Sequence, residues 1–423
     1  MNNVSAHRAF SFLRTYGYER VSCSKEERTV AEALLNECTS LGVSAQLEEF
    51  TVPCGRVSHA LLRVTSPYVK EYEVTGYERA ASTPEGGLDA EFLYVENADE
   101  VLLEQAKGKI VLVNGYLNRA TYEKLRKAEV AAILTFTGRT IDRENESDLN
   151  RCKLRETLTE PFGAIPVLNM RAASAAEIVR RGAKTVHIEL TGECYDGTSQ
   201  NVCATIPGTD KSSEVITLGG HYDSVYFSSG VHDNLSGSVI VLELLRYFAA
   251  HPPRRTLRFC WFGSEEQGLL GSKAYVKAHA DELKDCVAML NFDVAAPTLG
   301  SNHLVTLATD DALHYVTGVL REAGYGVRAR QDTYSSDCIP FADNGVPAIN
   351  LARFGANGAD YMHNRHDSLK SGYLDEHALD ITLQQGFVLL ERLANAASFP
   401  IKREITPEIR QKVDEYLFKA KKE

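Results

Sequence analysis

The stretch "LGGHYDSVYFSSGVHDNLSGS", from Leu218 to Ser238, decides how the whole chain is interpreted. Its apolar beginning ends directly before His221 and Asp223, and Asp233 follows just ahead of the helical sequence "NLSGSVIVLELLRYFAA". This order predicts a buried strand, a loop and a helix. The histidine and the two acidic residues would lie at the strand end and at the start of the helix.

Three further apolar runs lead into residues of the same kinds. "TLRFCWF" leads into Glu265 and Glu266, "CVAMLNF" ends at Asp293, and "VPAINLA" is followed through a loop by His363. Short apolar strands that alternate with helices predict a mainly parallel sheet covered on both faces. Ligands bind beyond the carboxyl ends of the strands in such sheets, so these side chains are expected to converge in one cleft.

The converging residue types indicate a metal site. Two imidazoles and several carboxylates suit zinc, with cobalt or manganese as alternatives. A carboxylate shared by two metals would make a two-metal hydrolytic centre, and Asp233 is the natural bridge. Asp223 could accept the second ring N–H of His221 and fix its tautomer. Of Glu265 and Glu266, one could bind a metal while the other acts as a general base.

Each of these features has a simpler explanation when taken alone. Two glutamates at a helix start balance the helix dipole, and Asp233 could be an N-cap. Their joint occurrence at strand ends favours a metallohydrolase. His232, His366 and Cys338 lie nearby in the sequence, and nothing assigns them a separate role.

Composition limits the class of protein. The 423 residues suit two domains, and 44% hydrophobic with 24% charged residues is ordinary for a globular protein. A net charge of −11 argues against nucleic acid or an anionic membrane as the main partner. The start has no signal-peptide core, and no run approaches the roughly 20 apolar residues of a membrane span. Nine scattered cysteines without a CxxC pair predict reduced thiols and a cytoplasmic location.

The chain is predicted to have an inserted module. The helical pattern over Lys25–Leu41 is followed by two strands, "VSAQLEEFTV" and "HALLRVTS". From residue 71 to 193 the pattern is that of a separate α/β module without a cluster of ligand or nucleophile residues. The peptide segments 1–70 and 194–423 would then form the main domain.

Within this module the order of elements is also predicted. "KGKIVLVNG" and "AIPVLNM" are strands, "ATYEKLRKAEVAAILTFTG" is a helix that runs into a strand, and "AASAAEIVRRGAK" is a helix. The charged segment 138–160 is predicted to be a loop, and residues 405–423 an amphipathic helix with a basic tail. The fold class is therefore α/β, with a mixed and mainly parallel central sheet flanked by helices.

The motifs around these residues resemble those of a known family. "GGHYDSV", "GVHDNLSGSVIVLELLR", "FGSEEQGLLGS", "NFDV", "SSDCIPFADNGVPAI" and "MHNRHDS" resemble, in order, the motifs of the M28 family of co-catalytic zinc aminopeptidases. The resemblance covers roughly Asn201 to Ser371. The middle block resembles a protease-associated (PA) domain through "GKIVLVNG", "KAEVAAILTF" and "IPVLNM", so the fold would be that of a zinc exopeptidase with a PA insertion.

This resemblance implies a role for each site residue. One zinc would be held by His221, Asp233 and Glu266, and the other by Asp233, Asp293 and His363. Glu265 would be the general base, Asp223 would orient His221, and Asp367 would support the ligands. A cis peptide is expected between Asp233 and Asn234. Where several members have a tyrosine for the oxyanion, this chain has Met362, with Tyr361 one position earlier.

The expected function is that of an aminopeptidase that hydrolyses N-terminal residues of peptides through a water activated by two zinc ions. Its partner is a peptide, with no nucleic acid and no membrane, and an oligomer is possible. Three alternatives stay open: a glutaminyl-cyclase-like acyltransferase with one zinc, a carboxypeptidase that acts on acidic C-termini, and a non-catalytic receptor-like protein. Metal content separates the first from the expected enzyme. The complete set of candidate ligand residues, together with the general base, argues against a non-catalytic receptor-like protein.

Overall fold

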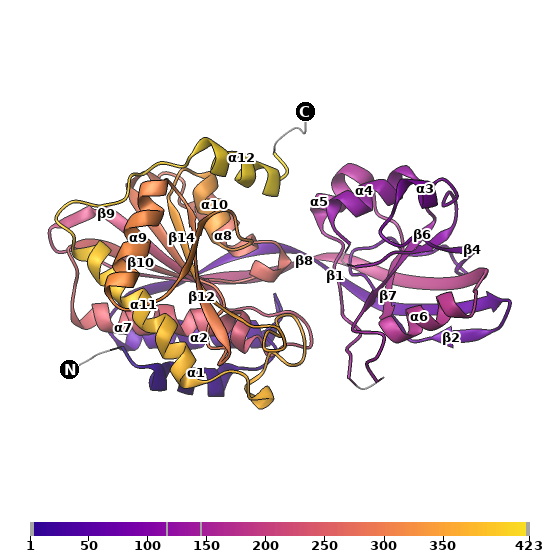
Figure 1. Cartoon of the computed structure of the whole chain (residues 1–423), viewed down its shortest axis with the longest axis horizontal. Coiled ribbons are helices and arrows are strands. Elements are labelled where there is room, and N and C mark those ends of the chain that lie inside the picture. Colours follow the sequence, from indigo (N-terminus) through magenta and orange to yellow (C-terminus); the bar gives the residue numbers. More distant parts are fainter. Residues whose placement is uncertain (1–3, 116, 144–145, 420–423) are drawn as a thin grey trace. The chain divides into compact units, whose positions relative to one another are not determined.

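The computed structural model describes residues 4–115, 117–143 and 146–419. It divides into two compact units, Met1–Val52 with Thr198–Glu423, and Pro53–Gly197. Figure 1 shows that two long strands, β1 (Ser44–Ser66) and β8 (Thr185–Ile206), belong partly to each unit. The unit boundaries therefore fall inside strands, at 52/53 and 197/198, whereas the sequence placed them at 70/71 and 193/194.

The first unit is built on a mixed sheet with the strand order β13-β12-β14-β11-β9-β10-β8. Its four central strands β14, β11, β9 and β10 are parallel, whereas β12 runs antiparallel to β14 and β8 antiparallel to β10. The edge strand β13 is parallel to β12. This confirms the predicted fold class. The bounds are β9 Lys211–His221, β10 Arg255–Phe262, β11 Cys286–Phe292, β12 Gly300–Leu307, β13 Arg328–Gln331 and β14 Ala348–Gly355.

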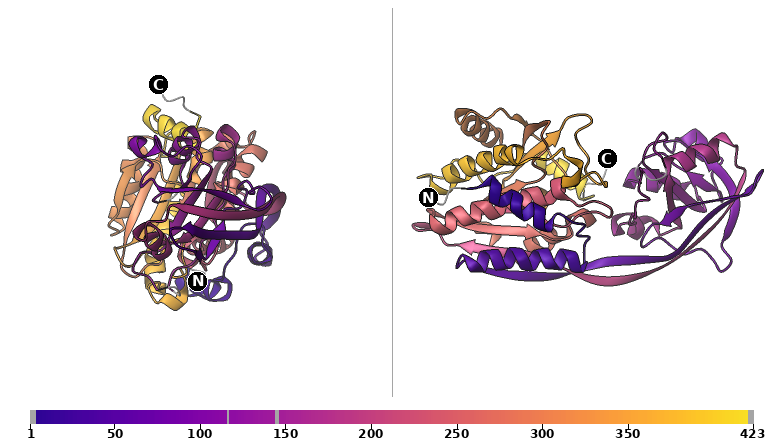
Figure 2. Two further views of the ribbon diagram at one scale, coloured as in Figure 1. Left: turned by 90° about the vertical axis from the view of Figure 1, so that its right-hand side faces the viewer. Right: turned by 90° about the horizontal axis from the view of Figure 1, so that it is seen from below.

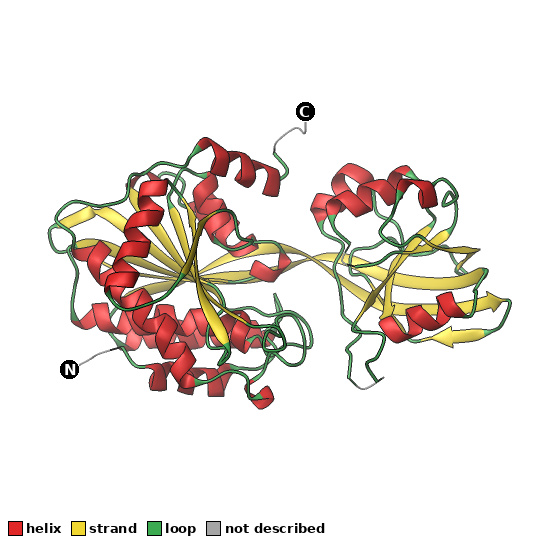
Figure 3. Cartoon of the chain, in the orientation of Figure 1, coloured by secondary structure: helices red, strands yellow, loops and turns green. Residues whose placement is uncertain are grey.

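Helices cover both faces of this sheet (Figure 3), and alternate strand residues point to the two groups of helices. Leu290 of β11 packs into one hydrophobic cluster and its neighbour Met289 into the other. The first cluster contains residues of α1 (Ala6–Tyr16), α2 (Lys25–Ser40), α7 (Ser236–Ala250), α9 (Asp310–Glu322) and α11 (Glu376–Asn395). The second contains residues of α8 (Leu270–Ala278), α10 (Cys338–Asp343) and α12 (Pro407–Tyr416). Among the described residues, no helix has the length and apolar character needed to cross a membrane.

In the second unit the strand order continues from β8, and the unit has its own hydrophobic clusters. Its strands follow the order β8-β4-β5-β6-β7-β3, and β4 to β7 are parallel. The predicted strands and helices of this module are confirmed, as Figure 2 shows from two further sides. The bounds are β2 Lys70–Tyr72, β3 Val74–Gly76, β4 Leu88–Tyr94, α3 Glu100–Leu103, β5 Ile110–Leu112, α4 Arg119–Lys127, β6 Ala132–Thr137, α5 Glu156–Phe162, β7 Val167–Arg171 and α6 Ala172–Arg180.

Three local predictions need correction. The two strands expected on either side of Pro53 are one strand, β1, which pairs with β8 and, over Leu62–Val64, with β2. A proline is tolerated within a strand where no neighbour needs its missing N–H. The charged segment 138–160 ends in α5 instead of staying a loop throughout, and its residues 144–145 lie outside the described residues. The C-terminal helix ends at Tyr416, and residues 420–423 of the basic tail also lie outside the described part.

Candidate metal centre

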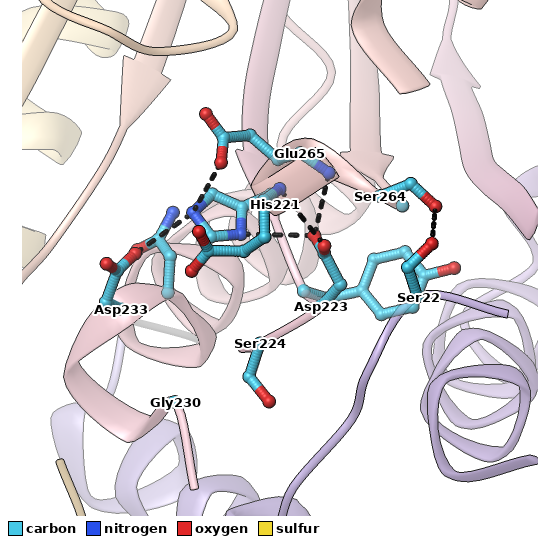
Figure 4. A network of polar contacts seen from close by, with 12 residues as sticks. Ser22, His221, Asp223, Ser224, Gly230, Asp233, Ser264 and Glu265 are labelled. Atoms are coloured by element: carbon cyan, nitrogen blue, oxygen red, sulfur yellow. Dashed lines mark hydrogen bonds and ion pairs between the residues drawn. The ribbon is translucent and has the colours of Figure 1, made fainter. Parts of the chain in front are cut away.

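The sheet brings the predicted residues to one edge. His221 is the last residue of β9, Asp293 follows β11, and Glu265 begins a short 3₁₀ turn after β10. Since these three strands are parallel neighbours, their carboxyl ends lie together. Asp233 lies just before α7, and His363 lies in the loop after β14. Figure 4 shows His221, Asp233 and Glu265 close together at this edge.

Five of these side chains form two groups that share one residue. His221, Asp233 and Asp293 offer ligand atoms within 4.8 Å of one another, and so do Asp233, Glu266 and His363. One carboxylate oxygen of Asp233 lies 3.1 Å from His221 Nε2, and the other lies 3.0 Å from His363 Nε2. Asp233 is therefore the residue that belongs to both groups, each of which could hold a metal ion.

The grouping of the other ligands differs from the one implied by the resemblance. Glu266 was expected beside His221, but its carboxylate lies 3.2 Å from His363 Nε2. Asp293 was expected beside His363, but it lies 3.7 Å from His221 Nε2. Strand order alone does not decide this grouping, because β9 lies between β10 and β11 and both follow it in parallel. The difference arises in the turn after β10, where the side chain of Glu266 faces His363.

The charge balance of these residues fits divalent cations. Burial raises the pKa of Asp293, although the neighbouring His221 acts in the opposite direction. The charge of Glu266 raises the pKa of His363 to about 12. Several buried carboxylates with only two imidazoles between them need added positive charge. Mixed imidazole and carboxylate donors are the ligands that zinc takes in proteins.

Asp223 supports the site in two ways. Its carboxylate oxygen lies 3.3 Å from His221 Nδ1, so that Nε2 of His221 faces the shared ligand group, as predicted. The same carboxylate accepts hydrogen bonds from the backbone N–H of Glu265 at 3.0 Å and of Glu266 at 3.2 Å. These two hydrogen bonds from backbone N–H groups were not predicted from the sequence. Asp223 therefore fixes a ligand histidine and the two glutamates together (Figure 4).

Asp367 holds the bridging residue in place. Its two carboxylate oxygens accept hydrogen bonds from the backbone N–H of His232 at 2.7 Å and of Asp233 at 3.0 Å. The peptide between Asp233 and Asn234 is cis, which confirms the expectation. Asn234 donates through its side chain to the carbonyl of Phe292, and thereby joins the start of α7 to the end of β11.

Glu265 lies beside the ligands but belongs to neither group. One of its carboxylate oxygens is 3.9 Å from His221 Nε2, and the residue is 9% exposed. Burial raises the pKa of its carboxyl well above the usual range, against the opposite charge of His221. Glu265 thus lies beside the two groups without belonging to either, and its role as a general base stays a prediction.

Tyr334 was not singled out in the sequence, and the charges of the ligand carboxylates act on its phenol. Burial, followed by the charges of Asp293 and Asp233, raises the pKa of its phenol, so the O–H stays a donor. The loop before α10 carries it, and no sequence pattern marks it. Tyr361, by contrast, donates its hydroxyl to the carbonyl of Gly358.

The residues without an assigned role stay outside the ligand groups of the described chain. His232 is buried and its Nδ1 lies 2.7 Å from the carbonyl of Ala295. The thiol of Cys338 points to the sulfur of Met289 at 3.8 Å. The ring of His366 packs against Tyr361.

The chain is similar in sequence and fold to known peptidases. Residues 201–384 match peptidase family M28. Aminopeptidase YwaD of Bacillus subtilis is 27% identical over 342 residues, 78% of this chain and 71% of that protein. Leupeptin-inactivating enzyme 1 of Streptomyces exfoliatus is 37% identical over 190 residues, 43% of this chain and 41% of that enzyme. In fold, the chain is similar to BSAP, a zinc aminopeptidase from Bacillus subtilis, with a TM-score of 0.78, 21% identity, and coverage of 97% of this chain and 100% of that one.

Proposed function

We propose that this chain, which carries an M28 peptidase segment over residues 201–384, is an aminopeptidase that releases N-terminal residues from peptides with the help of two zinc ions. The observation that carries the proposal is Asp233, which faces two separate ligand groups at once. The relatives named aminopeptidase support the same class of reaction.

The ligand groups divide the cations between two sets of side chains. His221, Asp233 and Asp293 would hold one, and Asp233, Glu266 and His363 would hold the other, with cobalt or manganese as possible substitutes. Two bound zinc ions supply a lowered pKa for water and a polarised substrate carbonyl.

The remaining chemistry belongs to residues of the chain. Glu265 accepts the proton of the attacking water and returns it to the leaving amine, because its carboxylate lies beside the ligands without belonging to them. We propose Tyr334 as the donor to the oxygen that gains charge in the tetrahedral step, because its phenol keeps its hydrogen within reach of the charges of Asp293 and Asp233. Asp223 keeps His221 oriented through both steps.

Hydrolysis of matched peptides tests the activity. Zinc-loaded protein should release the first residue from a peptide with a free amine and leave its N-acetylated form intact. Equal cleavage of both forms, or release of C-terminal residues alone, would remove the aminopeptidase proposal. Elemental analysis of the same protein should find close to two metal ions per chain. A single metal ion per chain after zinc reconstitution would rule out the second metal site.

The unit Pro53–Gly197 is proposed to be an inserted PA-type module. Its separate hydrophobic clusters support this assignment, together with the sequence resemblance of its strands. A crystal structure in which these residues have a different strand order would contradict it.

A cytoplasmic location stays a prediction that cell fractionation can check.

A further inference from the structure

The loop that carries the two site glutamates is held through its backbone. The N–H groups of Gly263, Ser264, Glu265 and Glu266 each donate to a buried side chain. The acceptors are Asn201 at 3.2 Å, Glu27 at 3.2 Å, and the two carboxylate oxygens of Asp223 at 3.0 and 3.2 Å, in that order. Four consecutive amides are thus fixed by three elements from distant parts of the sequence.

The conformation of this loop needs such support. Ser264 has a φ of +55° and Leu269 a φ of +60°, a left-handed region that residues with a side chain rarely adopt. Non-glycine residues stay there only where their surroundings determine the backbone. Ser264 is fully buried, and its hydroxyl lies 2.5 Å from that of Ser22 (Figure 4).

Glu27 is the one acidic residue of this support that the proposed mechanism does not use. It lies in the first turn of α2, is fully buried, and accepts hydrogen bonds at both carboxylate oxygens. One oxygen accepts from the hydroxyl of Ser199 at 2.8 Å and from the N–H of Ser264, and the other accepts from the N–H of Cys23 at 2.7 Å.

Gly263 makes the approach of Glu27 possible. A Cβ atom at Gly263 would lie 2.9 Å from the Glu27 oxygen that accepts from Ser264, and 2.6 Å from the hydroxyl of Ser199. Any larger residue would push the carboxylate off the loop. Gly263 and Glu27 therefore act together. Because Gly263 has no side chain, the carboxylate of Glu27 has room to accept the hydrogen bond from Ser264.

We infer that Glu27 is a positioning residue for the general base: it fixes the amide of Ser264 and thereby the direction in which the Glu265 side chain enters the site. The inference rests on the proposed role of Glu265. Glu27 itself acts only through the backbone. The oxygen that faces Ser264 can accept a hydrogen bond whether Glu27 carries a proton or not, so the role does not depend on its charge.

Two substitutions of Glu27 separate positioning from mere packing. Glu27→Gln keeps an acceptor for Ser264 but places an amide donor against the N–H of Cys23, whereas Glu27→Ala removes both acceptors. We expect kcat on the free-amine peptide to fall by roughly 10–100-fold for the alanine variant and less for the glutamine variant. KM and the metal content should stay close to those of the wild type.

Glu243→Gln is the matched control. Glu243 is also fully buried, also in the first unit, and accepts from the N–H of Ser5 and from Arg8. Its substitution should lower the thermal midpoint without lowering kcat of the folded enzyme. If Glu27→Ala and Glu243→Gln changed kcat equally, or if Glu27→Ala kept kcat within twofold, the inference would be overturned.

A double substitution asks whether Glu27 works through the base. Glu265→Gln combined with Glu27→Gln should be no slower than Glu265→Gln alone, because the residue being positioned no longer accepts a proton. A further loss of the same size as in the wild-type background would assign Glu27 a general structural role instead.

Amide hydrogen exchange provides a readout without activity. In metal-loaded protein, Glu27→Ala should speed exchange in the segment 263–269, and Glu243→Gln should not. Unchanged exchange there would overturn the inference even in an active enzyme. If the wild type cleaved none of the peptides, the proposed function would fail, while faster exchange in Glu27→Ala would still support the contact of Glu27 with the loop.

Discussion

Glu265 and Glu266 have the same side chain and adjacent positions, yet their surroundings differ. Glu266 belongs to the ligand group with Asp233 and His363, and Glu265 to neither group. Glu266→Gln should therefore lower the metal content and lose activity with it. Glu265→Gln should keep both metals and lower kcat by roughly 10²–10⁴-fold with a smaller change of KM. Metal analysis and steady-state kinetics of the two variants check this assignment, which the opposite pattern of metal loss would reverse.

Tyr334 gives a second prediction for a single side chain. Tyr334→Phe removes one phenolic donor from the site and should lower kcat by roughly 10²-fold, with KM little changed. Tyr361→Phe is the control, because that hydroxyl donates to the carbonyl of Gly358. Similar kinetics of Tyr334→Phe and the wild type would remove Tyr334 from the mechanism.

Glu27 should also be visible in the pH dependence of stability. Burial, and then the charge of Asp223, raises the pKa of Glu27 to about 8, above its ordinary value of 4.5. Between these two values the folded state binds more protons than the unfolded state, so the free energy of unfolding falls as the pH rises from about 4.5 to 8. Glu27→Gln lacks this titration. Urea unfolding at pH 5 and pH 8 should show a larger loss for the wild type than for the variant, and equal losses would contradict the shifted pKa.

The sequence predicted the ligand residues better than their partners. His221, Asp293 and Glu266 were recognisable because each follows an apolar run, and strand ends meet at one edge of a parallel sheet. Which of them face each other depends on the turns beyond the strands, and a linear pattern does not contain the direction of those side chains. Tyr334 carries no motif, and Glu27 shows only the S-x-x-E pattern of a helix start with Ser24, which does not point to Ser264. The contact of Glu27 with Ser264 joins segments far apart in the chain.

At the scale of elements, the segment between α1 and α2 connects to the loop before α7 through one buried cation. The guanidinium of Arg20 donates to the carbonyls of Tyr18, Tyr222, Ser229 and Gly230, among others, and is fully buried. Removing it leaves several carbonyls without a donor. We expect Arg20→Met to lower the free energy of unfolding by roughly 3–5 kcal/mol.

Denaturant unfolding of Arg20→Met checks this value. Arg14→Met is a suitable comparison, because Arg14 lies near the end of the neighbouring helix α1 and contacts the ring of Phe10. A loss below 1 kcal/mol for Arg20→Met would show that the contacts of its guanidinium add little to stability.

Most helices and strands were predictable because their apolar spacing is regular. The helix over Lys25–Leu41 ends one residue earlier than predicted, and Gly42, with a φ of +74°, follows its end. Length was harder to predict, because β1 continues through Pro53 where a break was expected. Proline stops a strand only where its missing N–H is needed by a neighbour, and that need depends on pairing.

For the whole molecule, all five ligand residues lie in the first unit, and each unit has separate hydrophobic clusters. Calorimetry should therefore show at least two unfolding transitions, of which zinc raises only one. Zinc at 100 times its Kd adds about 2.7 kcal/mol to the unit that binds it, or roughly 5–10 °C. A single transition that moves as a whole would show that β1 and β8 couple the units completely.

The unit boundary itself was the least predictable feature. Sequence patterns mark a boundary where a polar linker interrupts the elements, and here the chain crosses within β1 and β8. The composition does not change at Pro53, so the boundary was predicted at residue 70 instead. That residue is the start of β2.

The long-range contact between Glu27 and Ser264, 237 residues apart, has a consequence for the timing of synthesis. The ribosome synthesises α2 first, then the whole second unit, and only much later the strands that end at the metal-ligand residues. Contacts of such separation close late, after the domain made in between has had time to fold. The nascent chain should therefore hydrolyse neither its own termini nor those of neighbouring chains until His363 has left the exit tunnel. Chains arrested before that residue should hydrolyse nothing, and released full-length chains should gain activity in a single late step.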